Sequence, residues 1–157
     1  MLVFRIAHKN FSKELYATGA MGRWNEEGNK VIYCSESIPL AFLESMIRRQ
    51  GVGFNENFKI MIIEIPNELK QTIIDAGDLK EGWRDFRNYI SCQFLGNEWY
   101  KSGATPILKV PSAVLPEASN IVINTRHPDF AKIKLIETTN LVPDARIEEI
   151  LKRYSGK

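Results

Sequence analysis

The stretch GRWNEEGNKVIYCSESIPLAFLESMIRR, Gly22 to Arg49, contains three structural signals in succession. Glycines bracket a turn-rich segment at 22–28, where positive φ or close backbone approach is tolerated. The apolar run Val31–Cys34 predicts a short strand. A helix is predicted to begin near Ile38, because serine precedes it and proline suits its first turn. The stretch therefore predicts a turn, a strand and a helix packed closely together.

Each of these three elements carries a side chain suited to binding a nucleotide. Arg23 in the turn can bind phosphate oxygens with two parallel hydrogen bonds. The ring of Tyr33 can stack on a base or a pyridinium face. Glu44, on the second turn of the helix, can accept hydrogen bonds from ribose hydroxyls and stabilise an oxocarbenium-like centre. The combination fits cleavage of an N-glycosidic bond in a dinucleotide. The alternative is that all three are ordinary surface side chains, since charged residues are mostly exposed.

Several blocks of the chain, in order along nearly its whole length, resemble the RES domain, a toxin family named for its arginine, glutamate and serine. The resembling blocks are FRIA (Phe4–Ala7), GRWNEEG (Gly22–Gly28), VIYCSES (Val31–Ser37), LAFLES (Leu40–Ser45), KVPSAVLPEASNIVINTRHPDF (Lys109–Phe130) and PDARI (Pro143–Ile147). The resemblance implies an ADP-ribosyltransferase-like protein that degrades NAD by hydrolysis, or by phosphorolysis with inorganic phosphate. It also implies an antitoxin partner with an Xre-type helix-turn-helix.

The resemblance assigns roles to five residues. Arg23, Glu44 and Ser112 match the eponymous trio, and Tyr33 matches its aromatic partner. Arg5 matches a second arginine expected to line the NAD pocket. Without the resemblance, Arg5 would equally fit a strand at the edge of a sheet, where its charge is simply exposed.

Ser112 and Asn124 complete the set of candidate site residues. Ser112 directly follows a proline, and no histidine lies at a spacing that suggests a Ser-His-Asp triad. Ser112 is therefore interpreted as a hydrogen-bond partner rather than a nucleophile. The resemblance implies that it helps to fix the nicotinamide end of NAD or the neighbouring ribose. Asn124 is included as a substrate-binding candidate, although Asn120 and Asn124 could also satisfy turn backbone.

The length of 157 residues favours one domain that is long enough to bury a core. The resemblance implies that this domain is a RES domain over residues 1–157. The formal net charge is +2, and no basic tract indicates direct nucleic-acid binding. No apolar run has the length of a membrane span, and the N-terminal run is too short for a signal peptide, so we expect a cytoplasmic protein without a membrane partner. His8 and His127 lie outside any ligand cluster, and we expect no metal site.

The remaining pattern predicts an α+β fold, because strands and helices do not alternate regularly. Strands are predicted at Leu2–Ala7, Phe58–Ile65, Ile107–Val110, Ile121–Asn124, Ile133–Ile136 and Thr139–Val142. Residues 67–82 are predicted to be a loop with short structure, and Asp144 to cap a final helix. A helix is predicted at Asp85–Lys101, with Phe86, Tyr89, Ile90, Phe94 and Leu95 on its buried side. The fold implied by the resemblance is a compact core of mixed or antiparallel sheets with NAD in a cleft between them.

Three functions remain open on the sequence. The first is NAD degradation, by water or by phosphate. The second is transfer of ADP-ribose to a protein or metabolite. The third is a non-catalytic domain that binds a partner.

Overall fold

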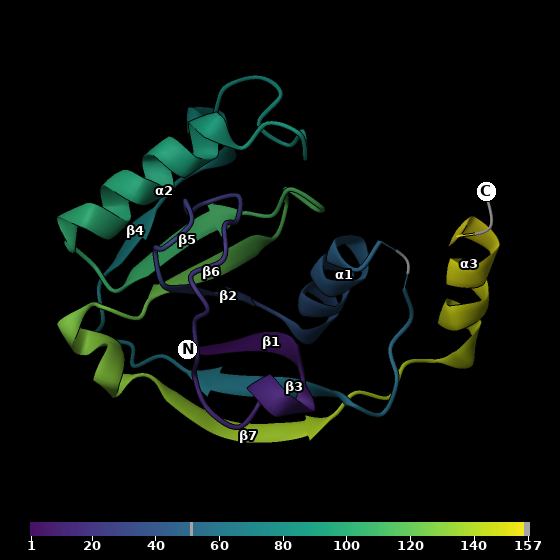
Figure 1. Ribbon diagram of the computed structural model, residues 1–157. Coiled ribbons are helices and arrows are strands. Elements are labelled where there is room, and N and C mark those ends of the chain that lie inside the picture. The colour runs from purple at the N-terminus through teal and green to yellow at the C-terminus, as the bar shows by residue number, and fades with distance from the viewer. Residues whose placement is uncertain (51, 156–157) are drawn as a thin grey trace.

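The structure is a computed structural model that describes residues 1–50 and 52–155. Figure 1 shows a sheet with two helices beside it and the C-terminal helix standing apart. The elements are β1 (Leu2–His8), β2 (Val31–Ser35), α1 (Ile38–Arg48), β3 (Phe58–Glu64), β4 (Gln71–Ile73), α2 (Ile90–Ser102), β5 (Ile107–Pro111), β6 (Ser119–Asn124), β7 (Lys134–Asn140) and α3 (Ala145–Ser155), with short 3₁₀ turns at Lys9–Phe11, Ala76–Asp78 and Pro128–Lys132.

Within the described residues, seven strands form one sheet in the order β4-β5-β6-β2-β1-β3-β7. All neighbours are antiparallel except β4 and β5, which are parallel. The predicted α+β class is thereby confirmed. The strand predicted at 58–65 lies inside the sheet as β3, between β1 and β7.

The sheet is divided at its middle, between β1 and β2. These strands pair at one position in the described chain, Phe4 opposite Ser35. By contrast, β1 pairs with β3 along its whole length, from Leu2 to His8, and β2 pairs with β6 along all of Val31–Ser35. The two halves of the sheet are therefore each continuous but joined by a narrow contact. Side chains of β1 and β2 can face a space between the halves.

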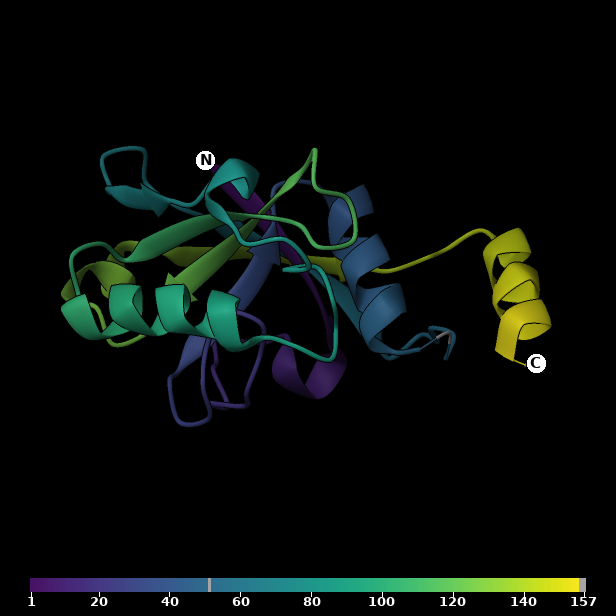
Figure 2. The same cartoon turned by 90° about the horizontal axis from the view of Figure 1, so that it is seen from above.

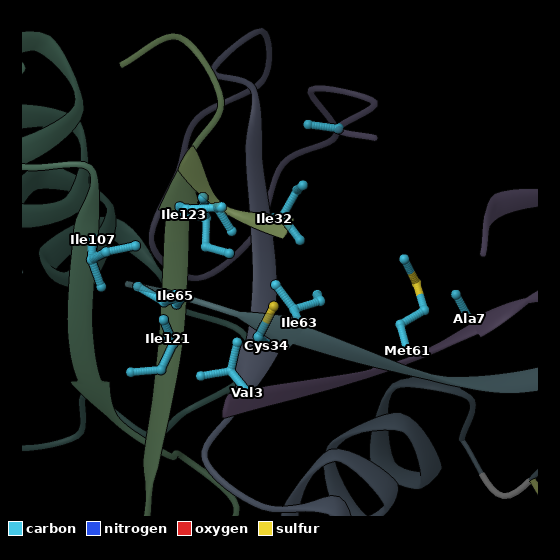
Figure 3. Packing of buried hydrophobic residues seen from close by; sticks show 12 residues of the cluster. Val3, Ala7, Ile32, Cys34, Met61, Ile63, Ile65, Ile107, Ile121 and Ile123 are labelled. Atoms are coloured by element: carbon cyan, nitrogen blue, oxygen red, sulfur yellow. The ribbon is translucent and has the colours of Figure 1, made fainter. Parts of the chain in front are cut away.

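Alternation along the strands builds two cores on opposite faces of the sheet. One core, shown in Figure 3, consists of aliphatic and sulfur-containing residues from both halves of the sheet, among them Val3, Ile32, Cys34, Met61, Ile63, Ile121 and Ile123. The other packs Val31, Leu108, Val110 and Val122 against Trp83, Cys92 and Trp99. Both tryptophans are thus core residues. Full burial of each large aliphatic side chain stabilises the fold by roughly 1.5–3 kcal/mol.

Helix α1 is fixed at its start by local sequence. The Ser37 hydroxyl accepts a hydrogen bond from the Leu40 backbone N–H at 3.3 Å, and a proline occupies the first turn. Its buried side contributes Ala41 to a third cluster with Ile6 and Phe54. This packing places the helix over β1, beside the division of the sheet.

The prediction for the helix at 85–101 is wrong at its start and for three of the five side chains predicted to be buried, whereas Leu95 packs against the core as predicted. The helix begins at Ile90, because Asp85 and Asn88 form turns in which their side chains accept backbone N–H groups of Arg87 and Ile90. Phe86, Ile90 and Phe94, predicted to be buried, are 76%, 78% and 64% exposed. The buried face is instead Cys92, Gly96 and Trp99.

One further segment differs from the sequence prediction. The strands predicted at 133–136 and 139–142 form one strand, β7, because the intervening residues continue its pairing with β3. The loop with short structure predicted at 67–82 is confirmed: it contains the three-residue strand β4, which extends the sheet beside β5, and the 3₁₀ turn at Ala76–Asp78. Helix α3 stands apart from the sheet at the end of an extended segment, as Figures 1 and 2 both show. No helix in the described chain is long and apolar enough to cross a membrane.

Candidate active site

Glu44 lies on α1 and points its carboxylate toward the ends of β5 and β6. Its Oε1 accepts hydrogen bonds from the Ser112 hydroxyl at 2.7 Å and from the Asn120 side-chain amide at 2.5 Å. Hydrogen bonds to a carboxylate are stronger than those between neutral groups. No described residue donates to Oε2. The carboxylate is thus fixed through one oxygen, and the other can meet a ligand.

Ser112 is fully buried directly after β5. Besides donating to Glu44, its hydroxyl oxygen accepts the backbone N–H groups of Val114 and Leu115 at 3.1 and 3.0 Å. These two acceptor contacts orient the hydroxyl hydrogen toward the carboxylate. In the described chain no histidine hydrogen-bonds to Ser112, so the geometry makes it a donor to Glu44.

Two further residues, Asn120 and Ser35, belong to the site although no sequence motif assigned them to it. Asn120, near the start of β6, donates to Glu44 through its side-chain N–H, while its side-chain oxygen Oδ1 accepts the Ser35 hydroxyl at 2.7 Å. Ser35 ends β2, directly opposite Asn120 in the sheet. The pairing of β2 with β6 therefore holds the Asn120 amide in place, and that amide in turn orients the Glu44 carboxylate. The signal available in the sequence was the pair of polar residues at the ends of two apolar strands.

Glu44 lies at a small cleft of about 40 Å³ where β1, β2 and α1 meet. The cleft is also lined by Arg5 from β1, Tyr33 from β2 and Arg48 from α1. The structure thus brings together four of the candidate residues, Glu44 with Ser112 by hydrogen bond and Arg5 with Tyr33 in the same cleft. Arg48, one helical turn after Glu44 on α1, is not among the residues that the sequence singled out.

Tyr33 presents its ring to the cleft but directs its hydroxyl away from it. The hydroxyl donates to Asn25 Oδ1 at 2.6 Å and accepts the Trp24 backbone N–H at 3.0 Å. Burial raises the pKa of Tyr33 above its usual range, although the Trp24 N–H opposes this. The phenol therefore remains neutral at physiological pH and anchors the turn at 22–25.

Arg23 is held outside this cleft. Its guanidinium donates to the backbone carbonyls of Trp83 at 2.5 Å and Arg84 at 3.3 Å. It also stacks over the Tyr89 ring, 4.5 Å from the centroid. In this structure Arg23 ties the segment before α2 to the turn at 22–25, and it does not line the cleft with Glu44.

Asn124 also lies away from the cleft, at the opposite end of β6 from Asn120. It is buried, its amide donates to the Tyr100 carbonyl at 3.5 Å, and its Oδ1 accepts the Arg126 backbone N–H at 2.9 Å. These contacts hold the turn after β6. The described residues contain no cluster of histidine, cysteine, aspartate and glutamate that could hold a metal ion.

Comparison with known proteins finds similar toxins in sequence and in fold. The chain is 34% identical over 129 residues to a protein of Sphingobium sp. named Prs ADP-ribosylating toxin, covering 80% of each. It is 30% identical over 139 residues to a protein of Pseudomonas putida named Toxin Res, covering 85% of this chain and 92% of that one. Its fold matches a chain of the M. tuberculosis MbcT–MbcA toxin–antitoxin complex with a TM-score of 0.72 at 14% identity, over 99% of this chain and 89% of that chain.

The residues that line the cleft fall within the part of the chain that matches a known family model. The RES domain matches residues 2–144, from β1 to the segment before α3. Glu44, Ser112 and the strands that position them all fall within this match, and the chain therefore belongs to the RES domain family.

Proposed function

We propose that this chain is the toxin of a toxin–antitoxin pair and that it cleaves the bond between nicotinamide and ribose in NAD. The observation that supports it best is the Glu44 carboxylate, held through Oε1 by Ser112 and Asn120 beside a cleft lined by an arginine and a tyrosine ring. A fixed carboxylate with one free oxygen suits a reaction in which positive charge develops on a sugar.

In the proposed reaction, Glu44 Oε2 accepts hydrogen bonds from the hydroxyls of the nicotinamide ribose. The glycosidic C–N bond breaks, and its electron pair goes to the pyridinium nitrogen, so nicotinamide leaves as a neutral molecule. No strong general acid is required. The carboxylate stabilises the developing oxocarbenium ion, with its orientation already set by Ser112 and Asn120.

Water or inorganic phosphate then attacks the ribosyl carbon. With water the products are ADP-ribose, nicotinamide and a proton. With phosphate the new C–O bond gives a phosphorylated ADP-ribose. The Tyr33 ring stacks on the nicotinamide, which its position in the cleft and its anchored hydroxyl allow.

A second candidate is transfer of ADP-ribose to a protein. It is favoured by the 34% identical relative whose name describes ADP-ribosylation of Prs. The same cleft would serve, since only the nucleophile at the ribosyl carbon differs. We also propose an antitoxin partner, of the Xre type suggested by the sequence, because the matched fold comes from a toxin–antitoxin complex. The cytoplasm, which holds an NAD pool, is the proposed location.

The test is an assay of purified protein with NAD in matched buffers with and without phosphate, with the products resolved by chromatography. Equal loss of NAD in both buffers, giving ADP-ribose, supports hydrolysis. Loss that requires phosphate supports phosphorolysis. Loss of NAD only when a candidate protein is added, with an adduct found by mass spectrometry, supports transfer. NAD that is neither consumed nor bound would leave a non-catalytic binding role.

Substitution Glu44→Gln isolates the charge of the carboxylate. Glutamine can keep an oxygen acceptor for Ser112 and Asn120 while it removes the charge at the free position. We expect the turnover of NAD to fall by about a hundredfold or more. The matched control is Glu98→Gln, an exposed helical glutamate on α2, which should retain the activity of the unmodified protein. Full turnover by Glu44→Gln would exclude this role.

A further inference from the structure

A second and larger cavity, of about 250 Å³, adjoins the cleft of Glu44. The two share four lining residues, Arg5, Ile6, Ser45 and Arg48, so they meet along one wall. The shared wall carries two guanidinium groups. The larger cavity continues past them toward the end of β1 and the 3₁₀ turn at Lys9–Phe11.

Within residues 1–50 and 52–155, the two arginines of the shared wall have no acidic partner. Among the ion pairs of the described chain, none involves Arg5 or Arg48. Arg5 makes one long hydrogen bond, 3.4 Å to the Tyr16 carbonyl, and no described residue hydrogen-bonds to the Arg48 side chain. Burial lowers the pKa of Arg5, and the like charge of Arg48 lowers it further. An anion placed between them would relieve this repulsion.

The neighbouring arginines are already engaged, which distinguishes Arg48 from them. Arg49 also lines the larger cavity, but it donates to the carbonyls of Val52 and Gly53 at 3.1 and 2.8 Å and stacks on Phe54 and Phe58. Arg23 is occupied by backbone carbonyls and by Tyr89. Of these three arginines, Arg48 therefore has the guanidinium best able to donate hydrogen bonds to a phosphate at the cleft.

The far part of the larger cavity is aromatic. Phe11 and Tyr16, both lining it, are 55% and 48% exposed, so their rings are available for contact. Exposed aromatic rings beside a cationic wall favour a flat heteroaromatic group joined to a phosphate.

We propose that Arg48 and Arg5 bind the pyrophosphate of the dinucleotide and that the larger cavity takes its adenosine half, so that the site selects a dinucleotide over a nicotinamide mononucleotide. This inference rests on the proposed function for the identity of the substrate. Arg48 is a substrate-binding residue in it, and Phe11 provides a stacking surface for the base.

Selectivity between NAD and nicotinamide mononucleotide is the first test. Both contain the bond that Glu44 would act on, but the mononucleotide lacks the adenosine half and the second phosphate. We expect kcat/KM to be about a hundredfold or more higher for NAD. Phe11→Ala should lower kcat/KM for NAD by about tenfold, chiefly through KM, and leave the mononucleotide unaffected. Arg48→Gln should raise the KM for NAD by tenfold or more with little change in kcat.

The matched control is Arg126→Gln, an exposed arginine after β6 that does not line either cavity. It should bind and cleave NAD as the unmodified protein does. Thermal unfolding of all variants shows whether a loss arises from the fold. Equal kcat/KM for the two substrates, or an Arg48→Gln variant with unaltered KM for NAD, would overturn the proposal while leaving the cleavage reaction intact.

Binding of ADP-ribose, measured by calorimetry, separates this inference from the proposed function because it needs no catalysis. We expect binding that is weakened about tenfold by Arg48→Gln and by Phe11→Ala and unchanged by Arg126→Gln. Such binding in a protein that fails to cleave NAD would preserve the dinucleotide site and reject the reaction. Absence of ADP-ribose binding in a protein that cleaves NAD would reject the dinucleotide site and support the cleavage reaction.

Discussion

Tyr33 has two separable parts, a ring that lines the cleft and a hydroxyl that holds the turn at 22–25. The hydroxyl contacts Asn25, whose side chain is 1% exposed, and the Trp24 backbone N–H. A buried polar atom that loses its partner costs free energy, because no water replaces the bond. The hydroxyl therefore contributes to stability, and the proposed role in binding NAD belongs to the ring.

Tyr33→Phe should lower the free energy of unfolding by about 1–3 kcal/mol, because it leaves the buried Asn25 Oδ1 and the Trp24 N–H without their partner. The measurement is urea unfolding followed by circular dichroism. Tyr16→Phe is the control, since Tyr16 is largely exposed and should stay within about 0.5 kcal/mol of the unmodified protein. A Tyr33→Phe protein as stable as the control would mean that the hydroxyl contacts contribute nothing.

At the scale of the elements, α2 is held against the turn at 22–25 by close backbone approach. Gly96 lies on the buried face of α2, and a Cβ there would lie within van der Waals overlap of the Trp24 carbonyl. The Gln93 side chain adds a hydrogen bond to the Gly22 carbonyl at 2.9 Å. The position of this helix thus supports the turn that carries Arg23 and receives the Tyr33 hydroxyl.

Gly96→Ala should destabilise the protein by about 1–3 kcal/mol or more, because the added methyl group forces α2 away from Trp24. Gly77→Ala is the matched control, since nothing lies within 4 Å of a Cβ at that position. Comparison of their thermal unfolding midpoints is the measurement. Equal midpoints would show that α2 can move without cost.

At the scale of the whole molecule, the buried thiols and the buried phenol make the stability of the fold depend on pH in the alkaline range. Burial raises the pKa of the Cys34 thiol to about 12, from 9.0 in an unfolded chain, and raises the pKa values of Cys92 and Tyr33 as well. A raised folded-state pKa gives stability that is present below the unfolded value and lost as pH rises toward the folded value. Three acids have lowered pKa values, namely Asp85, Asp129 and Asp144. Each forms an ion pair at the solvent-exposed surface, and such pairs contribute little to the free energy of unfolding.

The free energy of unfolding should therefore fall steadily between pH 9 and pH 12, by up to roughly 1.4 kcal/mol per pH unit for each buried group that ionises on unfolding. Urea unfolding at intervals across this range measures the slope. Cys34→Ala removes the largest contribution and should give a shallower decline. A decline equally steep in the variant would assign the loss to other groups.

The sequence by itself determined the α+β class, most of the strands, and the placement of Glu44 on helix α1. It did so because these depend on local periodicity and on the serine and proline at the start of the helix. It also indicated the family, which the match over residues 2–144 confirms. A single domain over residues 1–157 stays a prediction, as do the catalytic roles of Arg23, Tyr33, Glu44 and Ser112.

Only the tertiary structure decided which polar residues meet. Asn120 and Ser35 join Glu44 because β2 pairs with β6 in one register, and no local pattern specifies that register. Arg23 hydrogen-bonds to the carbonyls before α2, while Arg48 lines the cleft with Arg5, because packing of the helices sets where each guanidinium lies. The buried side of α2 was mispredicted for the same reason, since close approach at Gly96 outweighs the apolar stripe of Phe86, Ile90 and Phe94.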